Sequence, residues 1–197
     1  MSSNSSRTII AAALAACAAV AAPLAQAQDE AARTDEARAI AASLTTGLGG
    51  KLQEAIKSGG PAAAIGVCTS VAPTMTGALS RQRGIKVTRV SLKVRNPLLG
   101  TPDAWEQGVL AAFETRLAKG EAPDKLEFAE TVSEPAGKYF RYMKALPVQP
   151  LCLNCHGDAT RFAPEVREAL ARDYPADRAT GYAVGQLRGA ISIKQPQ

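Results

Sequence analysis

The chain has 197 residues, of which 46% are hydrophobic, a length and composition sufficient for one domain with an apolar core. Its formal net charge is +5, but basic and acidic residues are interspersed and no run of five like charges occurs. This distribution is typical of a solvated mixed surface and argues against a nucleic-acid partner.

The first 27 residues have the composition of an export signal. Arg7 is their only charged residue, an Ala-rich apolar run extends from Thr8 to Leu24, and Ala25-Gln26-Ala27 matches the small-x-small pattern that signal peptidase reads. Acidic residues begin only at Asp29. We therefore predict an export signal over residues 1–27, cleavage after Ala27 and a periplasmic location.

Leu14-Ala15-Ala16-Cys17 offers an alternative processing site. It resembles a bacterial lipobox, in which Cys17 would be lipidated and become the first mature residue. The apolar run continues past Cys17, which favours cleavage after Ala27. Attachment to a membrane is expected only in the lipoprotein alternative, through Cys17.

Helical periodicity dominates the first part of the mature chain. Apolar residues at three- and four-residue spacing predict a helix over 29–57, which Gly59-Gly60 end. Pro61 suits the first position of a second helix. We therefore divide the mature chain into an N-terminal helical segment, 28–60, and one domain, 61–197.

The second predicted helix carries Cys68, bends near Pro73 and ends at Gly84. A period of two then predicts a strand over 85–95, broken by Asn96-Pro97. The apolar face of this strand consists of Val90, Leu92 and Val94.

The remaining elements predict a sheet with one further helix on it. In chain order they are a helix from Thr101 to about Lys119, strands over 126–132 and 139–146 around a turn at 134–137, a short helix over 164–172 and a final strand over 186–194. The buried face of the 101–119 helix consists of Trp105, Val109 and Phe113. The sequence therefore predicts an α+β domain with helices first and a mostly antiparallel sheet after them.

Two scarce residue types meet in Cys152-Leu153-Asn154-Cys155-His156. His156 is the one histidine, and of four cysteines three remain without Cys17, an odd number for an oxidising compartment. In a C-x-x-C-H motif two thiols bind the vinyl groups of one haem and the adjacent histidine binds its iron. The sequence predicts one covalently bound haem c, with Cys152 and Cys155 as thioether residues and His156 as an axial ligand.

Three other uses of the motif compete with this interpretation. A disulfide between Cys152 and Cys155 would leave the neighbouring histidine unexplained. A thioredoxin-like redox pair requires a βαβ setting, which the predicted elements do not provide. A zinc site of Cys68, Cys152, Cys155 and His156 has the right ligand count, but adjacent Cys155 and His156 seldom bind one tetrahedral ion.

The single histidine restricts the second axial ligand, because it excludes a bis-histidine haem within this chain. The soft candidates are Met75, Met143 and Cys68, and an empty sixth position is the other alternative. The motif lies late and no methionine follows it, unlike in a class I cytochrome c. Cys68 is either a core cysteine or a thiolate ligand, which would lower the reduction potential where a thioether would raise it.

Several segments in one order carry a family resemblance. They are Ile65-Gly66-Val67-Cys68 with Ala72-Pro73, then 91–97, 102–106, 152–157, Gly181-Tyr182 and 188–192. Over about 63–193 the chain resembles the single-haem c-type cytochromes with a PAS-like haem domain, catalogued as a domain of unknown function. The resemblance implies a five-stranded antiparallel PAS-like sheet with flanking helices around one haem, and Cys68 with His156 as axial ligands. The segment Leu98–Thr101 departs from the more polar loop of that family.

Haem propionates need cationic or hydrogen-bonding partners when they are partly buried. The candidates are Arg89, Arg95, Arg141 and Arg188. Arg95 is favoured, because it ends a predicted strand beside a turn. The aromatic side chains that either line the haem pocket or belong to the ordinary core are Trp105, Phe113, Phe140, Tyr142 and Tyr182.

Two functions fit a single redox-active haem in an exported protein. The PAS-like resemblance favours a haem-based redox or ligand sensor, in which Cys68 leaves the iron on reduction and a separate signalling partner is informed. The alternative is a small periplasmic electron carrier that acts with a redox partner protein. We expect no enzymatic activity, because a peroxidase needs an open iron and a distal acid/base, and no second histidine exists. The sequence indicates no oligomeric state.

Overall fold

The computed structural model describes the backbone of residues 6–197 and the side chains of residues 28–197. The predicted signal over 1–27, with its Cys17 and Ala27, lies outside the residues whose side chains are described. Backbone contacts divide the chain into residues 1–36 and a folded unit over 37–197. Within the first unit, Arg33 pairs with Asp29 one helical turn away, at 2.9 Å.

The folded unit is of the α+β class, as predicted. The helices and strands are α1 (Ser6–Gly66), α2 (Ala72–Arg83), β1 (Lys86–Val90), α3 (Pro97–Gly100), α4 (Ala104–Ala118), β2 (Glu127–Glu134), β3 (Gly137–Pro147), α5 (Leu153–His156), α6 (Pro164–Asp173) and β4 (Leu187–Pro196). A π-helix spans Val67–Val71, and short 3₁₀ turns span Pro123–Lys125, Pro150–Cys152 and Ala159–Arg161.

Gly60 separates two helices within α1. Its φ of 75° and ψ of 179° lie outside the helical region, and glycine adopts positive φ without the usual steric cost. The predicted end at Gly59-Gly60 and the second helix from Pro61 are thereby confirmed. Gly84, with a φ of 64°, ends α2 in the left-handed conformation, also as predicted.

The irregularity predicted near Pro73 is the π-helix Val67–Val71. The Ala72 N–H bonds to the Val67 carbonyl, five residues earlier. Pro73 has no N–H, so the helix loses one hydrogen bond there, and the wider turn accommodates the loss. Cys68 lies within this stretch, and single π turns are frequent at functional sites.

The sheet has four strands in the order β1-β4-β3-β2, and each neighbouring pair is antiparallel. The described part of the chain thus forms one strand fewer than the resemblance implies. The β2–β3 hairpin confirms the predicted turn, since Glu134 lies opposite Gly137 and only Pro135 and Ala136 connect them.

The strand predicted over 85–95 ends five residues early, at Val90. The Ser91 N–H bonds to the Gly100 carbonyl at 3.2 Å, and the Ser91 hydroxyl bonds to the Lys93 carbonyl at 2.9 Å. These contacts turn the chain out of the sheet, so Leu92 is 38% exposed. The strand predicted over residues 91–95 from the alternation of apolar residues is therefore wrong.

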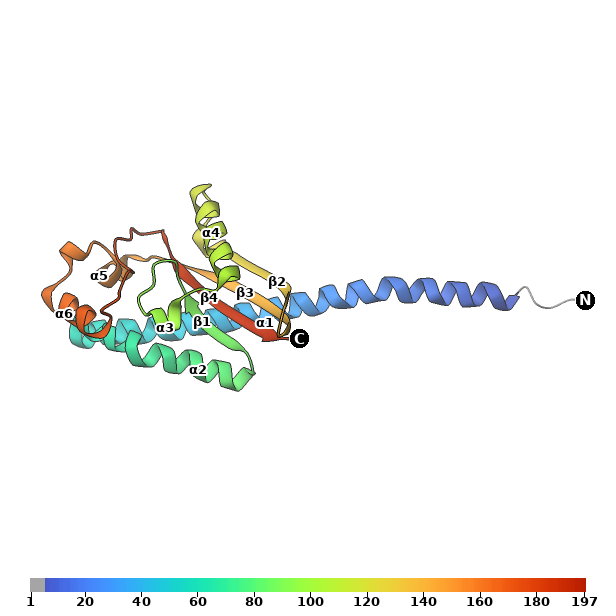
Figure 1. The fold of residues 1–197 in the computed structure, drawn as a ribbon, viewed down its shortest axis with the longest axis horizontal. Helices are drawn as coiled ribbons and strands as arrows, with labels where there is room; N and C mark the ends of the chain where they lie inside the picture. The colour runs from blue at the N-terminus through green and yellow to red at the C-terminus, as the bar shows by residue number, and fades with distance from the viewer. Residues whose placement is uncertain (1–5) are drawn as a thin grey trace, which may run out of the picture. The chain divides into compact units, whose positions relative to one another are not determined.

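Helices cover both faces of the sheet (Figure 1). The cluster on one face consists of Ala37, Ile40, Ala41 and Leu44 of α1 with Val87, Phe140, Tyr142, Ile191 and Ile193. The cluster on the other consists of Val109, Leu110 and Phe113 of α4 with Val90, Leu126, Met143, Ala145, Leu187 and Ala190. By length and composition, the helical stretch Gln28–Arg83 contains a window apolar enough to cross a membrane, a test that core helices and export signals also pass.

A charge network around the buried side chains of Arg141 and Glu106 fixes α4 to the sheet. Asp103 and Glu106 form a capping box at the start of α4, so this helix begins at Ala104, three residues later than the predicted start at Thr101. Arg141 of β3, which is 3% exposed, pairs with Asp103 at 2.6 Å and with Glu106 at 3.4 Å. Ser192 donates a hydrogen bond to Glu106 at 2.6 Å. Arg141, one of the propionate candidates, is thus engaged on the α4 side.

A second ion pair ties α1 to the sheet edge. The Arg38 guanidinium donates to both carboxylate oxygens of Glu127, with Nη2–Oε1 at 2.6 Å and Nε–Oε2 at 3.1 Å. The Tyr142 hydroxyl donates to the same carboxylate at 2.9 Å. Despite partial burial, the Arg38 hydrogen bonds, followed by that of Tyr142, lower the pKa of Glu127 from 4.5 to about 2.

Glu127 makes stability pH-dependent in acid. Because its folded pKa lies below its unfolded value, its contribution is complete above about pH 4.5 and is lost as pH falls towards about 2. Replacing Glu127 with Gln should remove on the order of 2 kcal/mol at pH 7 and flatten the acid limb of the stability curve. Urea unfolding between pH 7 and 2 measures this. Glu114→Gln, on the exposed side of α4, is the control, and parallel curves for wild type and Glu127→Gln would refute the assignment.

Candidate functional site

A cavity of about 450 Å³ lies between α2, β1, the 91–100 loop and the start of β4. This volume is within the range of small-molecule and cofactor sites. Cys68 and His156 both line it, although 88 residues separate them in sequence (156 minus 68). The basic residues on its walls are Lys86, Arg89, Arg95 and Arg188, and no carboxylate is among its lining residues. The site is therefore a cationic cavity with a thiol and an imidazole on its walls.

A short helical turn presents the C-x-x-C-H motif. Pro150–Cys152 is a 3₁₀ turn that continues into α5, so Cys152 and Cys155 are three residues apart on consecutive helical backbone. Gly157 ends the turn, and its N–H bonds to the Leu153 carbonyl at 3.0 Å. A Cβ at Gly157 would lie 2.7 Å from that carbonyl oxygen, so the close approach requires glycine.

The contacts of His156 define its protonation. Its Nδ1–H donates to the Ala179 carbonyl at 2.7 Å, which leaves the Nε2 lone pair as the acceptor. Burial, and then the positive charges of Arg188 and Arg95, lower the pKa of His156 to about 2. The imidazole is thus neutral and oriented by a backbone carbonyl, as metal-binding histidines usually are.

Arg95 is a buried side chain that contacts the C-x-x-C-H motif. Its guanidinium pairs with Asp177 at 2.9 Å, and the two side chains are only 7% and 10% exposed. It also donates to the Cys155 carbonyl, and its Nη1 lies 3.5 Å from His156 Nε2. The predicted propionate partner therefore lines the cavity with its charge already compensated by Asp177.

Arg188 reaches His156 because β4 has a bulge. The β3–β4 register shifts between Leu146 and Pro147, which leaves Arg188 as an extra residue in the ladder. Its Nε lies 3.4 Å from His156 Nε2 and 3.2 Å from Nδ1. Bulges commonly redirect a side chain beside a functional site.

The charge of Arg188 is not neutralised by a carboxylate within the described chain. Its guanidinium donates to the Ser91 hydroxyl at 2.8 Å, to the Lys93 carbonyl at 3.3 Å and, through Nε, to His156 Nε2 at 3.4 Å. Arg89 lines the same cavity from β1, and among the described residues it too has no ion pair. These two arginines leave the cavity with uncompensated positive charge.

The three described cysteines are free thiols. Cys68 and Cys155 pack against one apolar cluster around Ile65 and Tyr174, and burial raises the pKa of the Cys155 thiol. Between residues 28 and 197, no three His, Cys, Asp or Glu side chains gather as metal ligands. The arrangement thus contains neither the disulfide nor the four-residue zinc site weighed above.

The chain matches a family profile and a solved structure. The sequence profile of the Tll0287-like family matches residues 4–196. The chain belongs to the Tll0287-like family. A solved structure described as that of the cyanobacterial heme-protein Tll0287 is similar, with 28% identity, 65% of this chain and 71% of that chain covered, and a TM-score of 0.53. The search of curated proteins found no match.

In this Tll0287-like chain, the candidates for a second soft ligand lie in different places. Met143 is fully buried in the cluster under α4, and Met75 packs between α1 and α2. Of the three candidates only Cys68 lines the cavity. Tyr182 contacts the His156 ring edge-on, with ring centroids 6.3 Å apart.

Sequence reasoning missed several residues of the site. They are Ser91, Tyr174, Asp177 and Ala179. Ser91 lies in the 91–97 segment of the family resemblance, which gave it no role. No motif marks the other three, because their roles follow from contacts with residues far away in sequence. Phe113, Phe140 and Tyr142, by contrast, are core residues with no exposed surface.

The cavity wall depends on Gly189, which approaches Val90 closely. A Cβ at Gly189 would lie 2.2 Å from the Val90 carbonyl oxygen, so Gly189→Ala should separate β1 from β4 and cost about 2–4 kcal/mol of unfolding free energy. Gly108→Ala is the matched control, because a Cβ there would meet nothing within 4 Å beyond the adjacent backbone of its own helix. Helix propensity should raise its stability by about 0.5–1 kcal/mol. Urea titrations compare the two, and equal effects would contradict the packing argument.

Proposed function

We propose that this chain is an exported mono-haem c-type cytochrome, with Cys152 and Cys155 as the covalent attachment residues. The supporting observation is the cavity that has His156 and Cys68 on its walls, next to the C-x-x-C-H turn. The related structure's description as a heme-protein supports the same cofactor.

The residues present fit a haem. The cavity combines apolar side chains with basic ones, as a macrocycle with an apolar body and two carboxylates requires. Arg89 and Arg188 have no carboxylate partner among described residues and are suited to bind propionates, together with Arg95 as predicted from the sequence. When bound, the haem supplies a one-electron iron couple.

His156 and Cys68 are the proposed axial ligands. His156 Nε2 carries the lone pair that would bind iron, since Nδ1 donates to Ala179, and Arg188 and Arg95 lie beside it at 3.4 and 3.5 Å. Cys68 lies on the same cavity and would bind the iron as a thiolate. A thiolate donates electron density and would give a low reduction potential.

A redox or ligand sensor is the function that this geometry supports best. Cys68 lies in the π-helix Val67–Val71, which continues directly into α2. A change of ligand at Cys68 would therefore act on the helix that leads into α2 and β1. We propose a separate signalling partner, or a redox partner protein if the chain is an electron carrier, and no peroxidase activity.

The proposed location is the periplasm, with cleavage after Ala27. Lipidation at Cys17 would instead anchor the protein to a membrane. Mass spectrometry of the mature N-terminus distinguishes these two forms.

Covalent attachment is testable by mutating each thiol. In wild type expressed with a cytochrome c maturation system, haem should remain with the polypeptide on a denaturing gel, because thioether bonds survive unfolding. Cys152→Ser and Cys155→Ser should each lose one thioether bond and shift the pyridine haemochrome band, and the double variant should lose the haem stain. Cys68→Ala should keep the stain. A wild-type protein without covalent haem would refute the proposal.

Axial ligation is testable at Cys68. In Cys68→Ala, the ferric absorption and paramagnetic-resonance spectra should lose the low-spin signature of the wild type. Cys68→Met should raise the reduction potential. Unchanged low-spin ferric spectra in Cys68→Ala would exclude the thiolate. If the wild type keeps one ligand set in both ferric and ferrous forms, the electron carrier replaces the sensor.

A further inference from the structure

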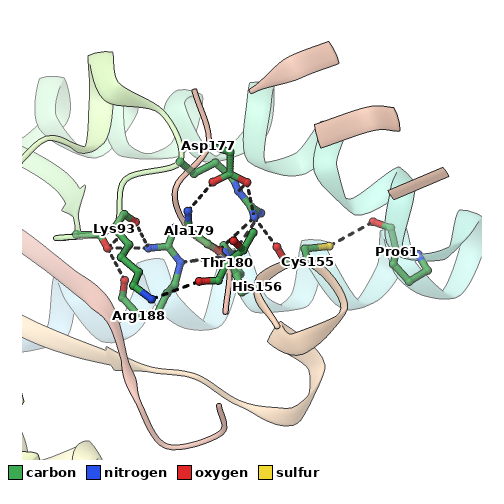
Figure 2. Close-up of polar contacts among 10 residues, drawn as sticks. Pro61, Lys93, Cys155, His156, Asp177, Ala179, Thr180 and Arg188 are labelled. Carbon is green, nitrogen blue, oxygen red and sulfur yellow. Dashed lines mark hydrogen bonds and ion pairs between the residues drawn. The ribbon is translucent and has the colours of Figure 1, made fainter. Parts of the chain in front are cut away.

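His156 is held by a chain of hydrogen bonds that runs through a turn far along the sequence. Figure 2 shows His156, Ala179 and Asp177 in this arrangement. The His156 Nδ1–H donates to the Ala179 carbonyl at 2.7 Å, and the Ala179 N–H donates to Asp177 Oδ1, also at 2.7 Å. One carboxylate therefore fixes the backbone of Ala179 through its N–H, and the carbonyl of the same residue orients the imidazole.

Arg95 closes this chain into a ring. Its Nε donates to Asp177 Oδ2 at 3.0 Å, and its Nη2 donates to the Cys155 carbonyl and, at 3.4 Å, to Ala179. The two charged side chains are almost fully buried, at 7% and 10% exposure. The ring thus joins three segments: the end of the 91–95 turn, the C-x-x-C-H motif and the turn at Asp177.

We infer that Arg95 and Asp177 form a positioning pair, which orients the iron-binding imidazole of His156 and sets the reduction potential through its charge balance. This inference rests on the proposed haem site. In this arrangement Arg95 pairs with the carboxylate of Asp177, whereas Arg188 and Arg89 have no ion pair with a carboxylate of residues 28–197.

The sign of each substitution follows from electrostatics. Asp177→Asn leaves the Arg95 cation uncompensated beside His156, which disfavours the oxidised iron and raises the potential. Arg95→Gln leaves the Asp177 anion uncompensated, which lowers the potential. At an effective dielectric constant near 20, either change should alter the ratio of oxidised to reduced protein about tenfold at a fixed solution potential. A merely structural role would move both variants in the same direction, because each loosens the same turn.

The experiment is a redox titration of the purified holoprotein for wild type, Asp177→Asn, Arg95→Gln and the double variant. Proton NMR of the oxidised protein reports the orientation of the His156 ring independently of the potential. Asp173→Asn is the matched control, since Asp173 carries the same charge nearby but pairs with Arg172 at the surface, at 2.8 Å. Arg95→Lys keeps the charge with fewer hydrogen bonds.

The pair is supported if Asp177→Asn and Arg95→Gln shift the potential in opposite directions and the double variant lies near wild type. Asp173→Asn should leave the potential unshifted. Arg95→Lys should alter the ring resonances of His156 but retain the potential. Same-sign shifts, or no shift with the haem stain intact, overturn it. If either single variant fails to fold, Asp177→Glu and Arg95→Lys take its place. Both retain charge, so each should keep the ratio of oxidised to reduced protein within about twofold of wild type at a fixed solution potential. Loss of covalent haem from wild type itself would count against the proposed function and not against the pair.

Discussion

The C-x-x-C-H turn is held in place by residues outside it, and the rest of the site depends on this support. A helix of four residues, Leu153–His156, is too short to be stable alone. The Tyr182 N–H bonds to the His156 carbonyl at 3.0 Å, and the Gly181 N–H bonds to the Gly157 carbonyl at 2.7 Å. The loop before β4 therefore carries the motif, and the position of β4 fixes that of the imidazole.

Much of the fold and the chemical identity of the site could be predicted from local patterns. The break at Gly60, the left-handed end at Gly84 and the hairpin turn before Gly137 follow from backbone preferences of single residues. The spacing of Cys152, Cys155 and His156 needs no tertiary information. The odd cysteine, Cys68, was found by counting, and the structure brings it to the cavity that His156 also lines.

The parts that could not be predicted depend on long-range contacts. β1 ends at Val90 because Ser91 bonds to Gly100 and to the Arg188 carbonyl, 97 residues away. Arg95 looked like a free cation at the end of a strand, whereas Asp177, 82 residues later, neutralises it. The position of Arg188 depends on a register shift that no periodicity in β4 reveals. In each case the structural role of the residue depends on a partner far away in sequence, so it cannot be predicted from the residue itself.

Two departures from regular structure meet at the cavity, and their coincidence has a physical reason. The π-helix around Cys68 lacks regular α-helical pairing, and the bulge at Arg188 interrupts the β3–β4 ladder. Regular elements point side chains at fixed intervals, so a thiol, an imidazole and a guanidinium from distant segments rarely converge without such adjustments. Natural chains accept these local costs where function requires them. The core lies on both faces of the sheet, with Leu44 and Phe113 almost fully buried. Its contribution to the free energy of unfolding offsets the destabilisation by the π-helix and the bulge.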